Sequence, residues 1–210
     1  EAVVIVRDFS IENPAMHDVA QVMRRAKREN YQVKIRRQAE IPATELSDLT
    51  KLTEQWRNGD ERGYSMASSR FGDPTDQQIM IVTASDAAGK VQGILSFVPV
   101  GSDKLSLDTM RRSPEAMNGA VTFMISSLIE AAKEKEISEI SLNFAAARQF
   151  FINGETLQAN ALDKAARTVM KFFSRWYQLE SLYRSNDIYL PEWRTRYICY
   201  DNGGSLTSVL

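Results

Sequence analysis

Residues 93–143 carry the pattern that decides the fold: GILSFVPVGSDKLSLDTMRRSPEAMNGAVTFMISSLIEAAKEKEISEISLN. Two apolar runs, GILSFVPV and KLSLDTM, flank the turn at residues 101–103 and predict two strands. After Asn118-Gly119, apolar residues recur at helical spacing from Val121 up to a charged end at residues 133–136. ISEISLNF then alternates apolar with polar residues. The order strand, strand, helix, strand therefore predicts an α/β sheet with a parallel βαβ crossover.

Charged residues stand where the second of these strands ends. Asp108, Arg111 and Arg112 stand at the exit of this strand, and charges at a strand end usually point into a cleft. Asp108 and Arg111 would face opposite sides of a regular strand, so a shared site requires the strand to end or bulge near Thr109. The alternative is a structural ion pair at the strand end.

The rest of the chain alternates strands and helices in the same way. Asn13 is a possible cap for a helix over residues 14–30, because Pro14 suits the first helical turn. Further strands are predicted at residues 3–9, 31–37, 77–86, 90–97 and 196–200, and further helices at residues 44–57 and 160–182.

The composition bounds the chemistry. With 210 residues and 43% hydrophobic content, the chain can form one sizeable domain or two small ones. A net charge of −1 gives no overall positive excess. The single histidine, His17, and the single cysteine, Cys199, argue against a zinc site, a disulfide framework and a Ser-His-Asp hydrolase. No stretch approaches the roughly 20 apolar residues of a membrane span. Because the chain begins at Glu1 rather than methionine, we expect a longer protein.

Two basic clusters frame the middle of the chain. The late cluster is interleaved with aromatic residues, including Trp176 and Trp193. Such mixtures suit phosphate groups of nucleic acid or lipid, although a solvated helix face with core aromatics is the alternative. The predicted phosphate contacts are Arg24, Arg25, Lys27 and Arg28 in the early cluster, and Arg175, Arg184, Arg194 and Arg196 in the late one.

Ten short motifs occur in collinear order over residues 8–200: DFS, MRRAKRENY, VKIRR, ERGYSM, RFGDP, GILSFVP, LSLDTMRR, NG, ISLNFA and SLYRSN. With them the chain resembles the C-terminal catalytic domain of bacterial lysylphosphatidylglycerol synthetases, especially the bifunctional type that also carries a lysyl-tRNA synthetase. The resemblance implies an acetyltransferase-like (GNAT) α/β fold, with a mixed central sheet flanked by helices, as the second copy of a tandem pair. Residues 1–38 would lead in from the preceding half, residues 39–201 would form the transferase domain, and residues 202–210 a tail or linker.

The resemblance also implies an activity. Lysyl-tRNA would donate lysine to a hydroxyl of phosphatidylglycerol on the cytoplasmic face of the bacterial membrane, beside transmembrane domains and, in the bifunctional type, a lysyl-tRNA synthetase domain, with no cofactor and no metal. Acetyltransferases hold coenzyme A on a [RQ]-x-x-G-x-[GA] loop, and RRSPEAMNGA lacks that spacing. Three alternatives stay open: transfer of another amino acid such as alanine, a CoA-dependent N-acyltransferase, and a non-catalytic module that docks tRNA or lipid.

A cationic lysyl ester requires carboxylate partners, so Asp108 and Glu61 are the predicted catalytic carboxylates. Arg111 would hold Asp108 in place, stabilise the developing oxyanion or hold a phosphate. Ile188 and Val100 depart from the family pattern, which leaves the transferred amino acid open. The predicted substrate-binding residues are Tyr64, Ser65, Arg112, Asn118 and Asn143.

Overall fold

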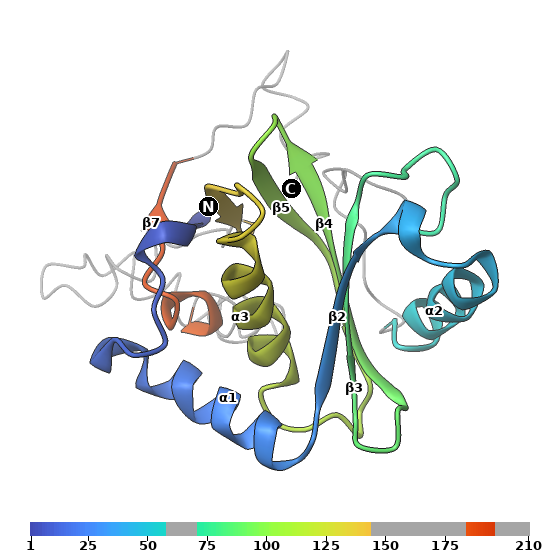
Figure 1. The fold of residues 1–210 in the computed structure, drawn as a ribbon, viewed down its shortest axis with the longest axis horizontal. Helices are drawn as coiled ribbons and strands as arrows, with labels where there is room; N and C mark the ends of the chain where they lie inside the picture. The colour runs from blue at the N-terminus through green and yellow to red at the C-terminus, as the bar shows by residue number, and fades with distance from the viewer. Residues whose placement is uncertain (58–70, 144–183, 196–210) are drawn as a thin grey trace, which may run out of the picture.

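The computed structural model describes residues 1–57, 71–143 and 184–195. Within these residues, seven strands form one mixed sheet in the order β2-β3-β4-β5-β6-β1-β7 (Figure 1). The strands are β1 (Ala2–Ile5), β2 (Gln32–Arg37), β3 (Met80–Ser85), β4 (Val91–Val100), β5 (Lys104–Arg112), β6 (Glu139–Ser141) and β7 (Glu192–Trp193).

Helices cover both faces of the sheet. α1 (His17–Arg28) and α3 (Ala120–Ala132) pack on one face, and α2 (Ala43–Gln55) lies on the other (Figure 1). Neighbouring residues of β4 divide between the two cores: Leu95 belongs to the core under α1 and α3, and Ile94 to the core under α2. This division is what strand alternation requires. Short 3-10 segments occupy Val6–Asp8, Pro14–Met16 and Gln38–Glu40.

The connections within residues 93–143 confirm the predicted order. β4 and β5 form an antiparallel hairpin, and α3 then carries the chain back so that β6 runs parallel to β5. The other paired strands are antiparallel, including the predicted β3–β4 hairpin. The βαβ crossover thus brings the start of β6 beside the start of β5.

Local chemistry explains where the first helical segment begins, and two other boundaries differ from the prediction. The Asn13 side chain accepts a hydrogen bond of 3.0 Å from the Ala15 N–H, which confirms the predicted cap at the beginning of the first helical segment. The predicted first strand over residues 3–9 is too long, because a 3-10 turn begins at Val6. α3 ends at Ala132, so the charged residues 133–136 follow the helix instead of closing it.

Several predictions concern parts of the chain outside the described residues. These are the helix over residues 160–182, the strand over residues 196–200, Cys199 and the tail over residues 202–210. The division at residue 38 stays a prediction, while β1 and β2 both belong to the common sheet. In the described ranges, no helix is both long and apolar enough to cross a membrane, and no group of three possible metal ligands occurs.

Candidate functional site

A β-bulge in β5 places Asp108 outside the regular strand pairing. Ser96 of β4 lies opposite Thr109, whereas the next residue, Phe97, lies opposite Leu107, so Asp108 is an inserted residue. Asp108 is half-buried. A site shared by Asp108 and Arg111 requires the strand to end or bulge near Thr109, and the strand does bulge there.

Ser96 supports this bulge, and sequence reasoning missed it. Its side chain is fully buried, and its hydroxyl oxygen accepts a hydrogen bond of 3.1 Å from the Thr109 N–H. A buried hydroxyl generally requires a partner. The available signal was a serine within the otherwise apolar run GILSFVPV of a central strand.

Strands β5 and β6 separate just before the bulge. Their parallel pairing covers three residue pairs and ends at Ser106 and Ser141, although β5 continues to Arg112. Asn143 then adopts a left-handed conformation with φ of 68°. Its side-chain amide donates a hydrogen bond of 3.2 Å to the carbonyl of Leu107, the residue before Asp108. The structure therefore brings Asn143 next to the backbone of the bulge.

Arg111 and Arg112 leave the bulge on opposite faces of the sheet. Arg111 lies opposite Ile94, which belongs to the core under α2, and it is half-buried. Arg112 lies opposite Gly93, whose missing Cβ would meet Met124 of α3, and it is exposed. Residues paired directly across two strands share a face, so only Arg111 lies on the α2 side.

In the turn between β5 and α3, four backbone N–H groups donate to acceptors within the protein. The Ser113 N–H donates to the Gln92 carbonyl, and the Met117 N–H donates to the Tyr31 hydroxyl at 3.0 Å. The N–H groups of Glu115 and Ala116 both donate to Ser113. Because four N–H groups before the helix already have protein acceptors, this turn offers few donors to a pyrophosphate. The exposed Asn118 is the residue before Gly119, the N-cap of α3.

Arg194 has carboxylate partners of its own. Its guanidinium donates to both carboxylate oxygens of Glu139, at 2.7 and 3.0 Å, and to Glu192 at 2.8 Å. Lys104 lies 3.0 Å from the same Glu139 carboxylate. Hydrogen bonds from Arg194, and then from Lys104, lower the pKa of Glu139 to about 2. This arrangement favours a structural role for Arg194 at the β6–β7 edge.

The remaining predicted residues are dispersed. Arg24, Arg25, Lys27 and Arg28 all lie on α1, where Arg25 is 3.9 Å from Glu29. Arg184 is exposed in a helical turn at residues 184–187. Val100 is exposed at the end of β4, whereas Ile188 packs against the larger core. Glu61, Tyr64, Ser65, Arg175 and Arg196 lie outside the described residues.

Comparisons with known proteins show the family of this chain. The family model described as "Phosphatidylglycerol lysyltransferase, C-terminal" matches residues 1–200. The chain is 40% identical over 210 residues to the lysylphosphatidylglycerol biosynthesis bifunctional protein LysX of Rhodococcus jostii, covering all of this chain and 19% of that protein. It is 44% identical over 203 residues to the LysX protein of Mycolicibacterium vanbaalenii, covering 96% of this chain and 18% of that protein. The chain therefore spans about a fifth of the length of these relatives.

Solved structures show the same fold. The structure of L-PGS from Bacillus licheniformis has a TM-score of 0.64 at 19% identity, and the match covers 92% of this chain and 57% of that chain. A C-terminal domain from Agrobacterium fabrum has a TM-score of 0.63 at 15% identity, covering 91% of this chain and 56% of that chain. The sequence matches confirm the predicted resemblance to the bifunctional type. This chain belongs to the family of phosphatidylglycerol lysyltransferase C-terminal domains.

Proposed function

We propose that this domain transfers lysine from lysyl-tRNA to a hydroxyl group of phosphatidylglycerol and so produces lysylphosphatidylglycerol. The lipid hydroxyl oxygen bonds to the ester carbonyl carbon, and the bond from that carbon to the tRNA ribose oxygen breaks. The proton passes from the lipid hydroxyl to the departing ribose oxygen. Because the donor is already an activated ester, positioning and charge stabilisation supply most of the acceleration.

The observation that carries the proposal is the insertion of Asp108 where β5 leaves β6. A half-buried carboxylate at this place suits the ammonium group of a lysyl ester, since charge-assisted hydrogen bonds are strong where water is partly excluded. Arg111 would stabilise the developing oxyanion or hold a phosphate, and Asn143 would fix the backbone of the bulge through Leu107. Glu61 remains a second proposed carboxylate.

The turn before α3 supports an aminoacyl-tRNA donor over coenzyme A. Four of its backbone N–H groups, at residues 113 and 115–117, donate to acceptors within the protein, as described above. A Cβ on Gly119 would lie 2.7 Å from the Val22 side chain, so this glycine permits close packing of α1 on α3. Gly119, at the start of α3, therefore serves the packing of the two helices. Within the described residues, no observation favours a CoA-dependent N-acyltransferase.

The wider setting is also part of the proposal. The seven strands of the described residues, with helices on both faces, suit an acetyltransferase-like unit, and the match to just over half of the Bacillus licheniformis chain leaves room for a second unit of a tandem pair. The relatives named bifunctional LysX are several times longer than this chain. We propose that this domain works at the cytoplasmic face of the membrane, beside transmembrane domains and, as in the bifunctional type, a synthetase domain of a longer protein.

A transfer assay tests the proposal. Purified protein containing the whole chain is incubated with phosphatidylglycerol vesicles and labelled lysyl-tRNA, and the lipids are separated by thin-layer chromatography. Asp108→Asn and Arg111→Ala should each lower the yield of lysylphosphatidylglycerol at least tenfold, roughly the effect of losing 1.4 kcal/mol of transition-state stabilisation. Asp48→Asn, an exposed carboxylate change on α2, is the matched control and should have no effect.

Parallel reactions settle the alternatives. If labelled alanyl-tRNA gives product and lysyl-tRNA does not, the transferred amino acid is alanine. If acetyl-CoA acylates an amine, the donor is an acyl-CoA. Absence of product from every donor would favour a docking module. Full yield from Asp108→Asn would remove Asp108 from the site.

A further inference from the structure

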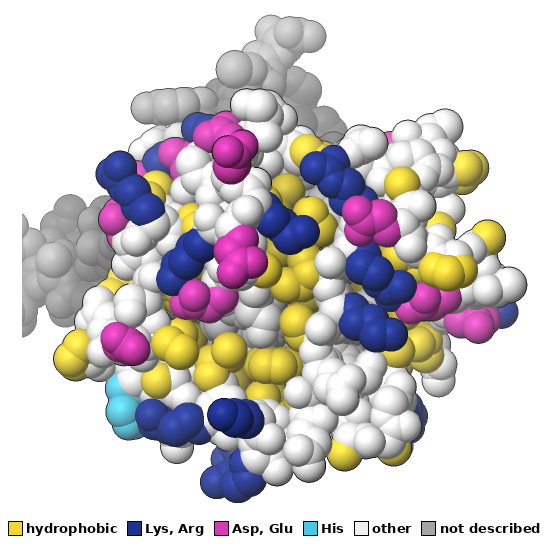
Figure 2. Space-filling view, viewed as in Figure 1, with side chains coloured by type: hydrophobic (Ala, Val, Ile, Leu, Met, Phe, Trp, Pro, Cys, Tyr) yellow, Lys and Arg dark blue, Asp and Glu magenta, His cyan; other side chains and the backbone are white. Residues whose placement is uncertain are grey.

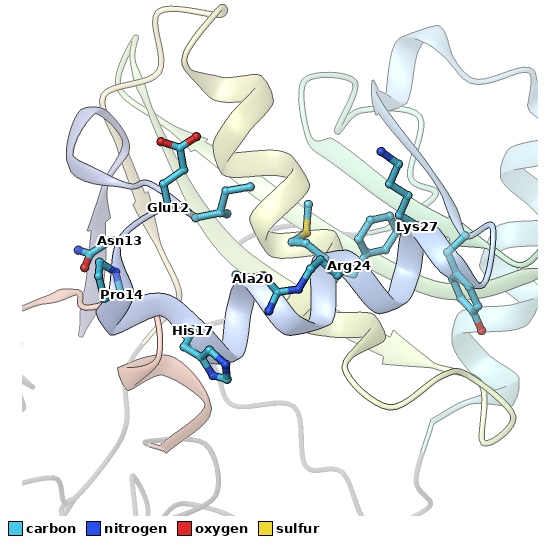
Figure 3. A pocket seen from close by; sticks show the side chains of 11 residues that line it. Glu12, Asn13, Pro14, His17, Ala20, Arg24 and Lys27 are labelled. Atoms are coloured by element: carbon cyan, nitrogen blue, oxygen red, sulfur yellow. The ribbon is translucent and has the colours of Figure 1, made fainter.

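An open groove of about 770 Å³ runs along α1 (Figure 3). One wall consists of α1 residues at positions 17, 20, 24 and 27, which follow helical spacing and therefore share one face of the helix. Residues 11–14, which precede α1 in the chain, also line the groove. A volume of this size lies within the range of about 300–1,000 Å³ that is typical of small-molecule sites.

The lining of the groove is mainly apolar. Tyr31 and Phe123 contribute their rings, which meet edge to face with centroids 6.5 Å apart. The Tyr31 hydroxyl already accepts the Met117 N–H at 3.0 Å, so its ring is the part that lines the groove. Ile11 and Met23 add aliphatic surface. An occupant that fills this groove must therefore have an apolar part.

The same helix supplies positive charge along the groove. Arg24 and Lys27 line it and are exposed, and no carboxylate in the described parts of the chain lies within ion-pair distance of either. Figure 3 shows Lys27 at one end, Glu12 at the other, and Arg24 between them along α1. In Figure 2, Lys and Arg side chains border a band of hydrophobic side chains over the same helix. Apolar surface and unneutralised cations thus lie side by side.

We propose that this groove binds an anionic phospholipid, with one acyl chain along Met23 and Phe123 and the phosphate at Arg24 and Lys27. An apolar groove flanked by cations complements a lipid, whose acyl chain and anionic headgroup are joined in one molecule. A nucleic acid requires cations along its backbone but gives no reason for an aliphatic lining. The inference deepens the proposed function and rests on it for the choice of phosphatidylglycerol as the lipid.

Vesicle co-sedimentation of the 210-residue chain, without any tRNA, tests this binding site. The chain should bind vesicles of mixed phosphatidylglycerol and phosphatidylcholine more tightly than vesicles of phosphatidylcholine alone. The double variant Arg24→Glu/Lys27→Glu should bind the mixed vesicles at least tenfold more weakly, because two cations near the phosphate become anions. Ala20→Glu should weaken binding even at high salt, since it puts a charge on the apolar wall. The double variant Lys51→Glu/Arg57→Glu, with both exposed residues at or just after α2, is the control of equal charge change and should bind as the unchanged chain does.

Three results would overturn the inference. The first is equal binding to both kinds of vesicle, and the second is unchanged binding by Arg24→Glu/Lys27→Glu. The third is a double variant that binds vesicles as the unchanged chain does but no longer binds deacylated tRNA in a separate binding measurement. Arg24 and Lys27 would then contact RNA. Since the assay contains no aminoacyl donor, a failure of lysine transfer leaves its outcome unaffected.

Discussion

At the scale of the residue, one inserted amino acid changes which side chains can act together. In a regular strand, Leu107, Thr109 and Arg111 would share a face. The bulge at Asp108 instead leaves Leu107 opposite Phe97, on the α3 side, and Arg111 opposite Ile94, on the α2 side. Inserted residues break strand alternation and often occur beside active sites. Asp108 and Arg111 can therefore belong to one site although they lie three positions apart.

Glu139 gives a pH-dependent prediction at the same scale. Its folded-state pKa is lowered from 4.5 to about 2, first by the hydrogen bonds from Arg194. A lowered carboxyl pKa contributes stability that is fully present above the unfolded value and is lost as the pH falls through the folded one. Glu139→Gln should therefore lower the free energy of unfolding by about 1–2 kcal/mol at pH 7. That difference should shrink as the pH falls from 4.5 toward 2.

Denaturant unfolding at pH 7, 5 and 3 measures this difference. Glu54→Gln, an exposed change on α2, serves as the control and should stay within about 0.5 kcal/mol. A difference between the unchanged chain and Glu139→Gln that stays constant from pH 7 to pH 3 would contradict the argument.

At the scale of the element, the start of α3 depends on contact with α1. Gly119 has φ of 91°, which side-chain-bearing residues rarely adopt, and it lies against Val22 of α1. Gly89, in the β3–β4 turn, has φ of 80° but nothing near the position of a Cβ. These two glycines therefore separate the cost of the backbone conformation from the cost of lost packing space.

Alanine substitutions at both glycines should differ in magnitude. Gly89→Ala should cost about 1–2 kcal/mol through backbone strain alone. Gly119→Ala should cost roughly 1–3 kcal/mol more, because its Cβ would lie 2.7 Å from a Val22 methyl group. Adding Val22→Ala should recover part of that extra cost, as measured by chemical denaturation in a double-mutant cycle. Equal costs at the two glycines would show that α1 moves away freely.

At the scale of the whole molecule, segments far apart in the sequence complete one sheet. β1 lies between β6 and β7, so the beginning of the chain is paired with residues near 140 and 192 (Figure 1). Before β7, Tyr189 is 2% exposed and belongs to the same buried cluster as Phe123 and Met124 of α3. Burial raises the pKa of Tyr189 well above its usual value. Residues 184–195 are thus anchored to α3 as well as to β1.

Removal of this anchor should destabilise the entire domain. Tyr189→Ala should lower the free energy of unfolding by about 3–5 kcal/mol, because it leaves a large cavity. Tyr189→Phe should cost only about 1 kcal/mol, because the hydroxyl alone is lost and the ring still fills its site. The neighbouring Leu190 is 52% exposed, so Leu190→Ala is the control and should have little effect. If calorimetry gives Tyr189→Ala and Leu190→Ala similar melting temperatures, residues 184–195 do not belong to the cooperative core.

The amino-acid sequence by itself determined the order of strands and helices over residues 93–143, the hairpins and the cap at Asn13. These features depend on hydrophobic periodicity and turn chemistry, which act between residues close in the chain. Only the tertiary structure decided that the bulge falls at Asp108 and rests on Ser96, that β1 enters between β6 and β7, and that α1 and Phe123 line one groove. Each of these requires partners distant in sequence, and strand register and helix packing are fixed by what the opposite surface offers.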